Sequence, residues 1–278
     1  MTTVSSIDLS SLQTTFDSIQ QKAESIGLAS PTLGSANNTI NINFYMTDAK
    51  KLMPQNPNEY IDMVHVNTAF TTSCNSNQTT INLFRKEEWF KVFLHETMHS
   101  LGIDFSSISI TDESNMTKKL IDTCFHGVKS NDLRIYEAYT EFWAEFIHIL
   151  FLVKNRNEIT KRIHRETEWS LIQANKILSY YNIQYNDLFH NDKIYQEHQG
   201  VVVFSYYILK SILWFHLDSV LEWCHQHNNT DIISCFHFDK NHIDSFITNL
   251  CEWAKDPNYA IALKTVKKPS SNTLRMSV

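Results

Sequence analysis

Three observations in the sequence predict an α+β fold. Segments that alternate apolar and polar residues, as half-buried strands do, lie between residues 39 and 84. From residue 86 onward, apolar residues recur at three- and four-residue steps, as on the buried face of a helix. Only 5 Gly and 5 Pro occur in 278 residues, too few for a β-barrel or a many-turned sandwich. Strands followed by helices in this way predict a small sheet and a helical C-terminal half.

The first part of the chain supplies the predicted sheet. Residues 7–28 have the periodicity of an amphipathic helix, and Ser, Pro, Gly and Asn then interrupt the pattern. Residues 39–46 alternate as a half-buried strand does, and residues 63–72 and 79–84 are two further strand candidates. Residues 73–77 join these two candidates and have the composition of a turn.

Helices account for most of the remaining chain. Residues 87–101 predict a helix that Gly102 terminates, and residues 106–129 predict a loop with a short helix at 116–124. Asn131 or Asp132 is a suitable cap for a long helix that ends near residue 153. The remaining predicted helices span residues 158–181, 201–225 and 242–254.

These elements predict one domain over residues 1–264. Its sheet and first long helix occupy residues 39–105, and its helical part occupies residues 131–256. Residues 265–278 are rich in Ser and Lys and predict a mobile tail.

Composition and charge exclude several classes of partner. Hydrophobic residues make up 42% of the chain and charged residues 19%, as in a soluble protein with a substantial core. The formal net charge of −6 lacks the basic character of a nucleic-acid-binding protein, so we expect no nucleic acid partner. The two most apolar segments, residues 142–153 and 200–217, are too short or are interrupted by Lys210, so we expect no membrane span.

The compartment follows from the cysteines and the first residues. Five Cys are widely spaced and odd in number, which indicates reduced thiols. The first 19 residues contain no Lys, no Arg and no apolar run, unlike a secretory signal. We therefore expect an intracellular, cytoplasmic protein.

The segment His95-Glu96-Thr97-Met98-His99 is an HExxH motif on the predicted helix 87–101. Two His four residues apart lie on one helix face and can reach the same ion, and Glu96 projects beside it. Neutral imidazoles suit Zn²⁺, which binds an activated water when the protein supplies three ligands. His95 and His99 are therefore candidate zinc ligands, and Glu96 is a candidate general base.

The third ligand decides between types of zinc site. Gly102 invites comparison with the metzincin pattern HExxHxxGxxH, but this chain has Phe105 where that pattern requires a ligand. Glu137 and Glu141, four residues apart in an apolar predicted helix, offer a ligand and a hydrogen-bond partner for a ligating His. Two possibilities stay open: a solvated stripe on that helix, or ligation by another residue, for which the candidates are Glu141, His126, Asp104 and Cys124.

In this combination of HExxH and later glutamates, residues 95–146 resemble the gluzincin, or thermolysin-like, group of zinc metallopeptidases. That group follows HExxH with ExxxD on a second helix, and this chain has Glu141 at the place of the Asp. The resemblance implies a zincin-like fold, with Glu137 as third ligand of one zinc ion and Glu141 holding His95 in place. It also implies hydrolysis of a peptide or protein substrate.

The donor that stabilises the oxyanion in such an enzyme is less evident from the sequence. His198 and Tyr206 are the candidates, because they flank the start of a predicted buried helix; Tyr207, Tyr195 and His190 are nearly equivalent. Two rival hypotheses remain at this stage. One is a zincin-fold binding or regulatory protein without activity, and the other is a helical protein whose HExxH is accidental.

Overall fold

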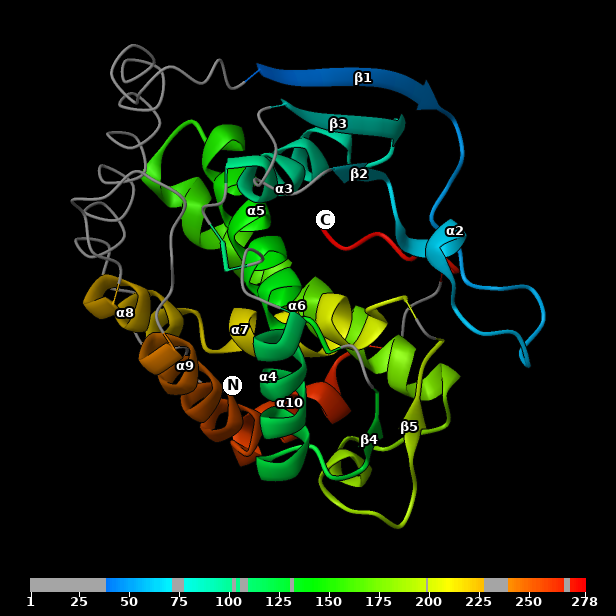
Figure 1. The fold of residues 1–278 in the computed structure, drawn as a ribbon, viewed down its shortest axis with the longest axis vertical. Helices are drawn as coiled ribbons and strands as arrows, with labels where there is room; N and C mark the ends of the chain where they lie inside the picture. Colours follow the sequence, from blue (N-terminus) through cyan, green and yellow to red (C-terminus); the bar gives the residue numbers. More distant parts are fainter. Residues whose placement is uncertain are drawn as a thin grey trace.

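The computed structural model describes residues 39–71, 78–101, 104–105, 110–130, 133–198, 200–227, 240–267 and 271–278. The predicted helix at residues 7–28 lies outside these ranges. Within them, the order of elements confirms the α+β class, with a small sheet first and helices afterwards. Figure 1 shows the sheet above helix α3 and most of the helices below it.

The three-stranded sheet contains strands β1 (Thr39–Thr47), β2 (Ala69–Thr71) and β3 (Gln78–Arg85), in the order β1-β3-β2. β1 runs parallel to β3, and β2 runs antiparallel to it. The central strand is anchored by Ile81 and Leu83, which are fully buried. β1 forms where the alternation predicts it but is more exposed than expected, because it is an edge strand; Ile42 remains 39% exposed.

The predicted strand at residues 63–72 is half wrong. Its first part is a helical turn, α2 (Met63–Val66), and only Ala69–Thr71 enters the sheet as β2. The Asp62 side chain accepts a hydrogen bond from the Met63 amide at 2.6 Å, and the Asp62 amide donates to His65 Nδ1 at 2.9 Å. This capping box favours a helical turn over the extended conformation that the apolar residues suggest.

One helix lies under the sheet, and a second packs against it. α3 (Trp89–Leu101) and α5 (Ile135–Leu152) pack against each other, and each lies within two to four residues of its predicted bounds. Between them, α4 (Ile110–Thr123) is longer than the short helix expected there. Thirteen of the 18 residues of α5 are buried, so this helix runs through the centre of the molecule.

Most of the remaining helices lie below α3 and α5 in the view of Figure 1. They are α6 (Arg156–Tyr180), the 3-10 helix η1 (Tyr185–Phe189), the π-helix η2 (Phe204–Leu209), α7 (Lys210–Phe215), α8 (Leu217–His227), α9 (Lys240–Ala254) and α10 (Pro257–Thr265). The predicted helix at 201–225 is therefore three elements, with a break at His216. A short parallel pair, β4 (Val128–Lys129) and β5 (Tyr195–Gln196), was not predicted.

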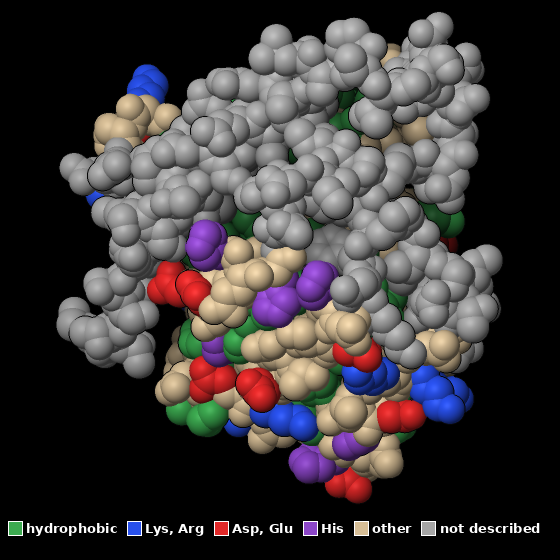
Figure 2. Space-filling view, turned by 60° about the vertical axis from the view of Figure 1, so that its left-hand side comes forward, with side chains coloured by type: hydrophobic (Ala, Val, Ile, Leu, Met, Phe, Trp, Pro, Cys, Tyr) green, Lys and Arg blue, Asp and Glu red, His purple; other side chains and the backbone are tan. Residues whose placement is uncertain are grey.

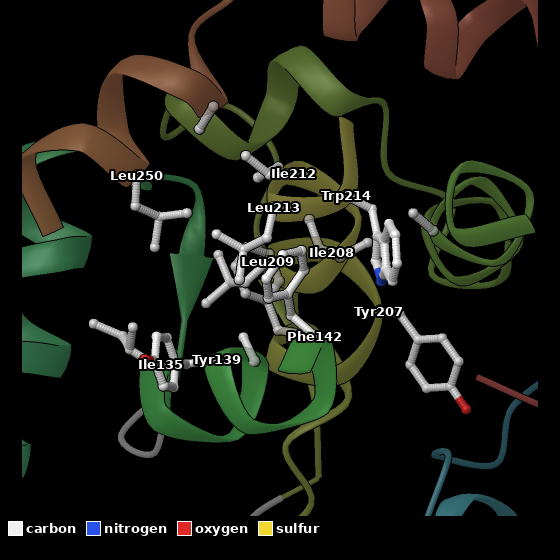
Figure 3. Packing of buried hydrophobic residues seen from close by; sticks show 14 of the residues in the cluster. Ile135, Tyr139, Phe142, Tyr207, Ile208, Leu209, Ile212, Leu213, Trp214 and Leu250 are labelled. Atoms are coloured by element: carbon white, nitrogen blue, oxygen red, sulfur yellow. The ribbon is translucent and has the colours of Figure 1, made fainter. Parts of the chain in front are cut away.

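The main core lies between α5 and the η2–α7 segment, as Figure 3 shows. Phe142 of α5 and Trp214 of α7 are in contact, with ring centroids 5.3 Å apart, and both are almost fully buried. Ile208, Leu209 and Leu213 complete the contact and have no exposed surface. Burial of this apolar surface fixes α5 against the helices below it.

The C-terminal residues 271–278 differ from the mobile tail that composition predicts. Leu274 is fully buried and Met276 is 4% exposed. The segment runs between the α2 region and the helices (red in Figure 1). Its backbone pairs with the loop before α2: the Leu274 amide donates to Lys51 O, and the Met53 amide donates to Asn272 O, both at 2.8 Å. Composition fails here because side chains and backbone from distant parts of the sequence hold the segment.

The surface of the described region carries both signs of charge. Figure 2 shows acidic, basic and histidine side chains interspersed on the lower half of the face in view. Among the described residues, no helix combines the length and the apolar character needed to cross a membrane.

Candidate metal centre

Helix α3 brings the two histidines of HExxH together. His95 and His99 are one turn apart on the face of α3 that packs against α5, and both are buried. Their Nε2 atoms lie 2.9 Å apart. The sequence places them there because apolar residues recur on the same helix and draw this face into the interior.

Helix α5 adds the predicted third group. Glu137 Oε2 lies 3.2 Å from His95 Nε2 and 3.3 Å from His99 Nε2. Ligands at 2.0–2.1 Å around a tetrahedral ion are about 3.3 Å from one another. The three atoms, on three buried side chains, therefore have the spacing of one face of a tetrahedral site.

Two further carboxylates orient the imidazoles from behind. Glu141 Oε2 lies 2.8 Å from His95 Nδ1, the position expected from the sequence. Asp104 Oδ2 contacts His99 Nδ1 and accepts a hydrogen bond from Thr140 Oγ1 at 3.0 Å. Asp104 was a candidate ligand in the sequence, but it contacts the outer nitrogen of His99. Each histidine thus has its own buried carboxylate.

This arrangement fixes the tautomers. A carboxylate only accepts hydrogen bonds, so His99, bonded to Asp104, carries its proton on Nδ1 when neutral. The negative charge of Glu141, 2.8 Å from His95 Nδ1, favours the same tautomer of His95. Both Nε2 atoms then present lone pairs to the same point as Glu137 Oε2. Three acceptors that converge within 3.3 Å repel one another unless a cation or protons lie between them.

The candidate ligands also shift one another's pKa values. Burial opposes the charged form of His99, yet Glu137 and Asp104 raise its pKa well above the usual value. Burial likewise opposes ionisation of Glu137, but His99 and His95 hold its pKa below the usual range. The site therefore favours a carboxylate at Glu137 and positive charge beside it.

Glu96 lies next to this cluster without belonging to it. Its side chain is buried, and burial raises the pKa of its carboxyl group. A carboxylate whose pKa lies closer to 7 is a more effective general base at neutral pH. Glu96 lines a recess together with His95, Tyr206 and residues 67–69, which lead into β2.

The structure separates the two predicted donors. Tyr206 lies in η2 and donates from its hydroxyl to Glu137 Oε2 at 3.1 Å. His198 is exposed; it lies 3.9 Å from Asp62 and packs near Tyr60, and it does not line the recess. Tyr207, an equal candidate in the sequence, donates instead to Leu274 O at 2.6 Å.

The remaining candidates for the third ligand lie away from the cluster. His126 is exposed, and Cys124 Sγ faces Cys251 O at 4.0 Å. A solvated stripe on α5 is also excluded, because Glu137, Glu141 and Glu145 are at most 8% exposed.

One supporting residue was not predicted. Lys91 is fully buried, lies one turn before His95 on α3, and donates through Nζ to Glu141 Oε1. It keeps Glu141 ionised, since the positive charge of Lys91 offsets the burial that would raise the pKa of Glu141. The four-residue spacing from His95 was the available signal, but the sequence alone does not show that this lysine is buried.

Comparison with known proteins assigns no family to the chain. No model of a known protein family matches the chain, and no solved structure matches it. An uncharacterized protein of Acanthamoeba polyphaga mimivirus is 24% identical over 200 residues, which cover 64% of this chain and 50% of that protein. The chain thus spans about half the length of this curated relative.

Proposed function

We propose that the protein is a zinc metallopeptidase with a zincin-like fold. One observation carries the proposal: the Nε2 atoms of two histidines and one oxygen of Glu137 converge at tetrahedral spacing. A carboxylate lies beside the outer nitrogen of each histidine, and the histidines keep Glu137 ionised. Two His and one Glu suit Zn²⁺, and three protein ligands leave an open position for water. His95, His99 and Glu137 would hold the ion.

Zinc bound there supplies a Lewis acid and acidifies water near neutral pH. Glu96 accepts the proton of the attacking water and delivers it to the leaving amine. The Tyr206 hydroxyl, already directed at the cluster, donates a hydrogen bond to the developing oxyanion. Glu141 and Asp104 keep both Nδ1 atoms protonated, so that both Nε2 lone pairs remain available.

The sheet edge supports a peptide as substrate. β2 is an edge strand, and Thr68 and Ala69 line the same recess as Glu96. An extended chain can add to such an edge through backbone hydrogen bonds, which bind a peptide without regard to its side chains. This feature favours peptide hydrolysis over hydrolysis of a small ester or amide.

The substitution Glu96→Gln tests the proposal. We expect the purified protein to contain one zinc per chain by elemental analysis and to cleave peptides of a mixed library, detected by mass spectrometry. Glu96→Gln should retain the zinc and lose about 10²–10⁴-fold in kcat, the contribution of a general base. Glu252→Gln, at an exposed glutamate on α9, is the matched control and should leave both unchanged.

The result also separates the competing hypotheses. Zinc in stoichiometric amount with no cleavage by the wild type would favour a zincin-fold binding or regulatory protein. A wild type that holds no zinc after mild dialysis would contradict the metal centre itself.

A further inference from the structure

The C-terminal segment, residues 271–278, is held along its backbone by side chains from several elements. Glu88 Oε1 accepts hydrogen bonds from the Met276 amide at 3.0 Å and from the Ser277 amide at 2.8 Å. Lys210 Nζ donates to Met276 O at 2.5 Å. The Trp169 indole donates to Arg275 O at 3.2 Å. Because the backbone is bound on both sides of Met276, the position of this side chain is fixed.

Met276 contacts a residue that supports the candidate metal centre. Its Sδ lies 3.9 Å from Lys91 Nζ, the group that contacts Glu141. Its side chain lines the recess that also contains His95, Glu96 and Tyr206. A segment about 180 residues after HExxH in the sequence thus supplies one wall of the space beside the general base.

The recess is small. Its volume is about 30 Å³, which is room for one or two water molecules. A substrate bound along β2 with its scissile bond at Glu96 would place a neighbouring side chain here, since Thr68 and Ala69 line the same space. Met276 is one of the residues that line this space and so limit the size of a side chain placed there.

We propose that Met276 restricts the site to peptides with a small residue, such as Gly, Ala or Ser, beside the scissile bond. The inference rests on the proposed function. Truncation of Met276 to Ala shortens the side chain that forms the recess wall and enlarges the space beside Glu96. Met276, Val66 and Val92 are on the apolar side of the recess, and Lys51, Lys91 and Glu141 are among the residues that line the rest of it. Against an apolar wall, a difference of one methylene corresponds to about a 10- to 200-fold change in discrimination.

The test compares two probes that bind zinc directly, so that it does not depend on turnover. These are peptidyl hydroxamates that carry either a methyl or an isobutyl side chain next to the chelating group. For the wild type we expect the methyl compound to bind at least about 10-fold more tightly by calorimetry. Met276→Ala should reduce this ratio at least about 10-fold, and Met276→Leu should preserve it. If peptides are cleaved, the same shift should appear in kcat/KM for Ala- and Leu-containing substrates.

Leu274→Ala is the matched control, because Leu274 is buried in the same segment but does not line the recess. It should loosen the segment without changing the ratio. If Met276→Ala does not fold, as judged by circular dichroism, Met276→Val provides a smaller truncation and should give an intermediate ratio.

Three results would overturn the inference: no binding of either probe, tighter binding of the isobutyl compound by the wild type, or a ratio in Met276→Ala within about twofold of the wild type. A ratio that shifts as expected in a zinc-containing protein that cleaves no peptide would contradict only the peptidase proposal.

Discussion

Helix α5 carries three buried glutamates at four-residue spacing, Glu137, Glu141 and Glu145. The groups that face these carboxylates differ between the two ends of the helix. At one end, Glu145 lies 2.7 Å from Lys210 Nζ and accepts a hydrogen bond from the Trp214 indole at 2.7 Å. At the other end, Glu137 faces His95 and His99, whose outer nitrogens are already committed to carboxylates. The same residue type, at two positions eight residues apart on one helix, contacts an amine and an indole in one place and faces a candidate cation site in the other.

The difference lies in the elements opposite each glutamate. α7 presents a lysine and an indole, which are donors, whereas α3 presents imidazoles fixed as acceptors. Glu141 lies between them and contacts both Lys91 and His95. A buried carboxylate alone therefore indicates neither a salt bridge nor a metal ligand; its neighbours decide.

The largest expected effect is on zinc affinity, which should fall when the glutamate at the Glu137 end of α5 is replaced and stay unchanged when Glu145 is replaced. Glu137→Ala should lose at least about 10³-fold in zinc affinity, because only two protein ligands remain. Glu145→Gln should keep one zinc per chain, since Glu145 contacts Lys210 and Trp214 instead. Competition with a chromophoric chelator measures both affinities, and equal loss in the two variants would contradict the distinction.

Stability should show the opposite pattern. Glu145→Gln removes the carboxylate that contacts the buried Lys210 Nζ at 2.7 Å, whereas the more distant Glu141 and Glu166 still offset part of the lysine charge. We therefore expect the free energy of unfolding to fall, by at most about 3–5 kcal/mol. The double variant Glu145→Gln/Lys210→Met removes the unpaired charge and should recover at least half of that loss, while the introduced amide oxygen still accepts from Trp214. Urea unfolding at neutral pH is the measurement. A double variant less stable than the single one would show that the ion pair is not what the site requires.

The carboxylates behind the histidines should have a smaller effect on zinc than the ligand itself. Asp104→Asn and Glu141→Gln each weaken the acceptor that holds an Nδ1 proton, and such partners contribute about 10–100-fold to metal affinity. The chelator competition used for Glu137→Ala measures this too. An unchanged affinity in Asp104→Asn would mean that His99 is oriented by α3 alone.

Much of this site was predictable because its signals are local. HExxH is a spacing on one helix, and Glu137 and Glu141 share a face of a helix that is otherwise apolar. Both patterns depend only on the helical repeat, which the sequence shows directly. The β3 strand was predictable for the same reason, from its two-residue alternation.

The features that the sequence left open or missed depend on contacts between distant residues. Tyr206 and Tyr207 are adjacent, and which one faces Glu137 is set by the π-helix, whose repeat differs from the one assumed. Asp104 reaches His99 from just beyond the end of α3, where the helical repeat no longer gives directions. Glu88, Lys210 and Trp169 form hydrogen bonds with the backbone of the C-terminal segment. The composition of the segment itself does not indicate these contacts.

Glu166 of α6, which accepts a hydrogen bond from the Val278 amide, gives the smallest expected effect and extends the comparison to a carboxyl beside the C-terminal segment. Burial raises its pKa to about 7 from the usual 4.5, against the opposing influence of Lys210. In the folded protein it therefore stays protonated up to about pH 7, whereas in the unfolded chain it ionises above about pH 4.5. Its contribution to stability is intact below pH 4.5 and is lost as the pH rises through 7.

Glu166→Gln removes this loss, so it should be close to the wild type at about pH 5 and about 1–2 kcal/mol more stable at about pH 8, part of the gain being offset by repacking around the amide. Urea unfolding of both proteins at the two pH values measures the difference. A variant that is less stable at the higher pH would show that Glu166 is ionised in the fold and that a nearby buried lysine stabilises its charge.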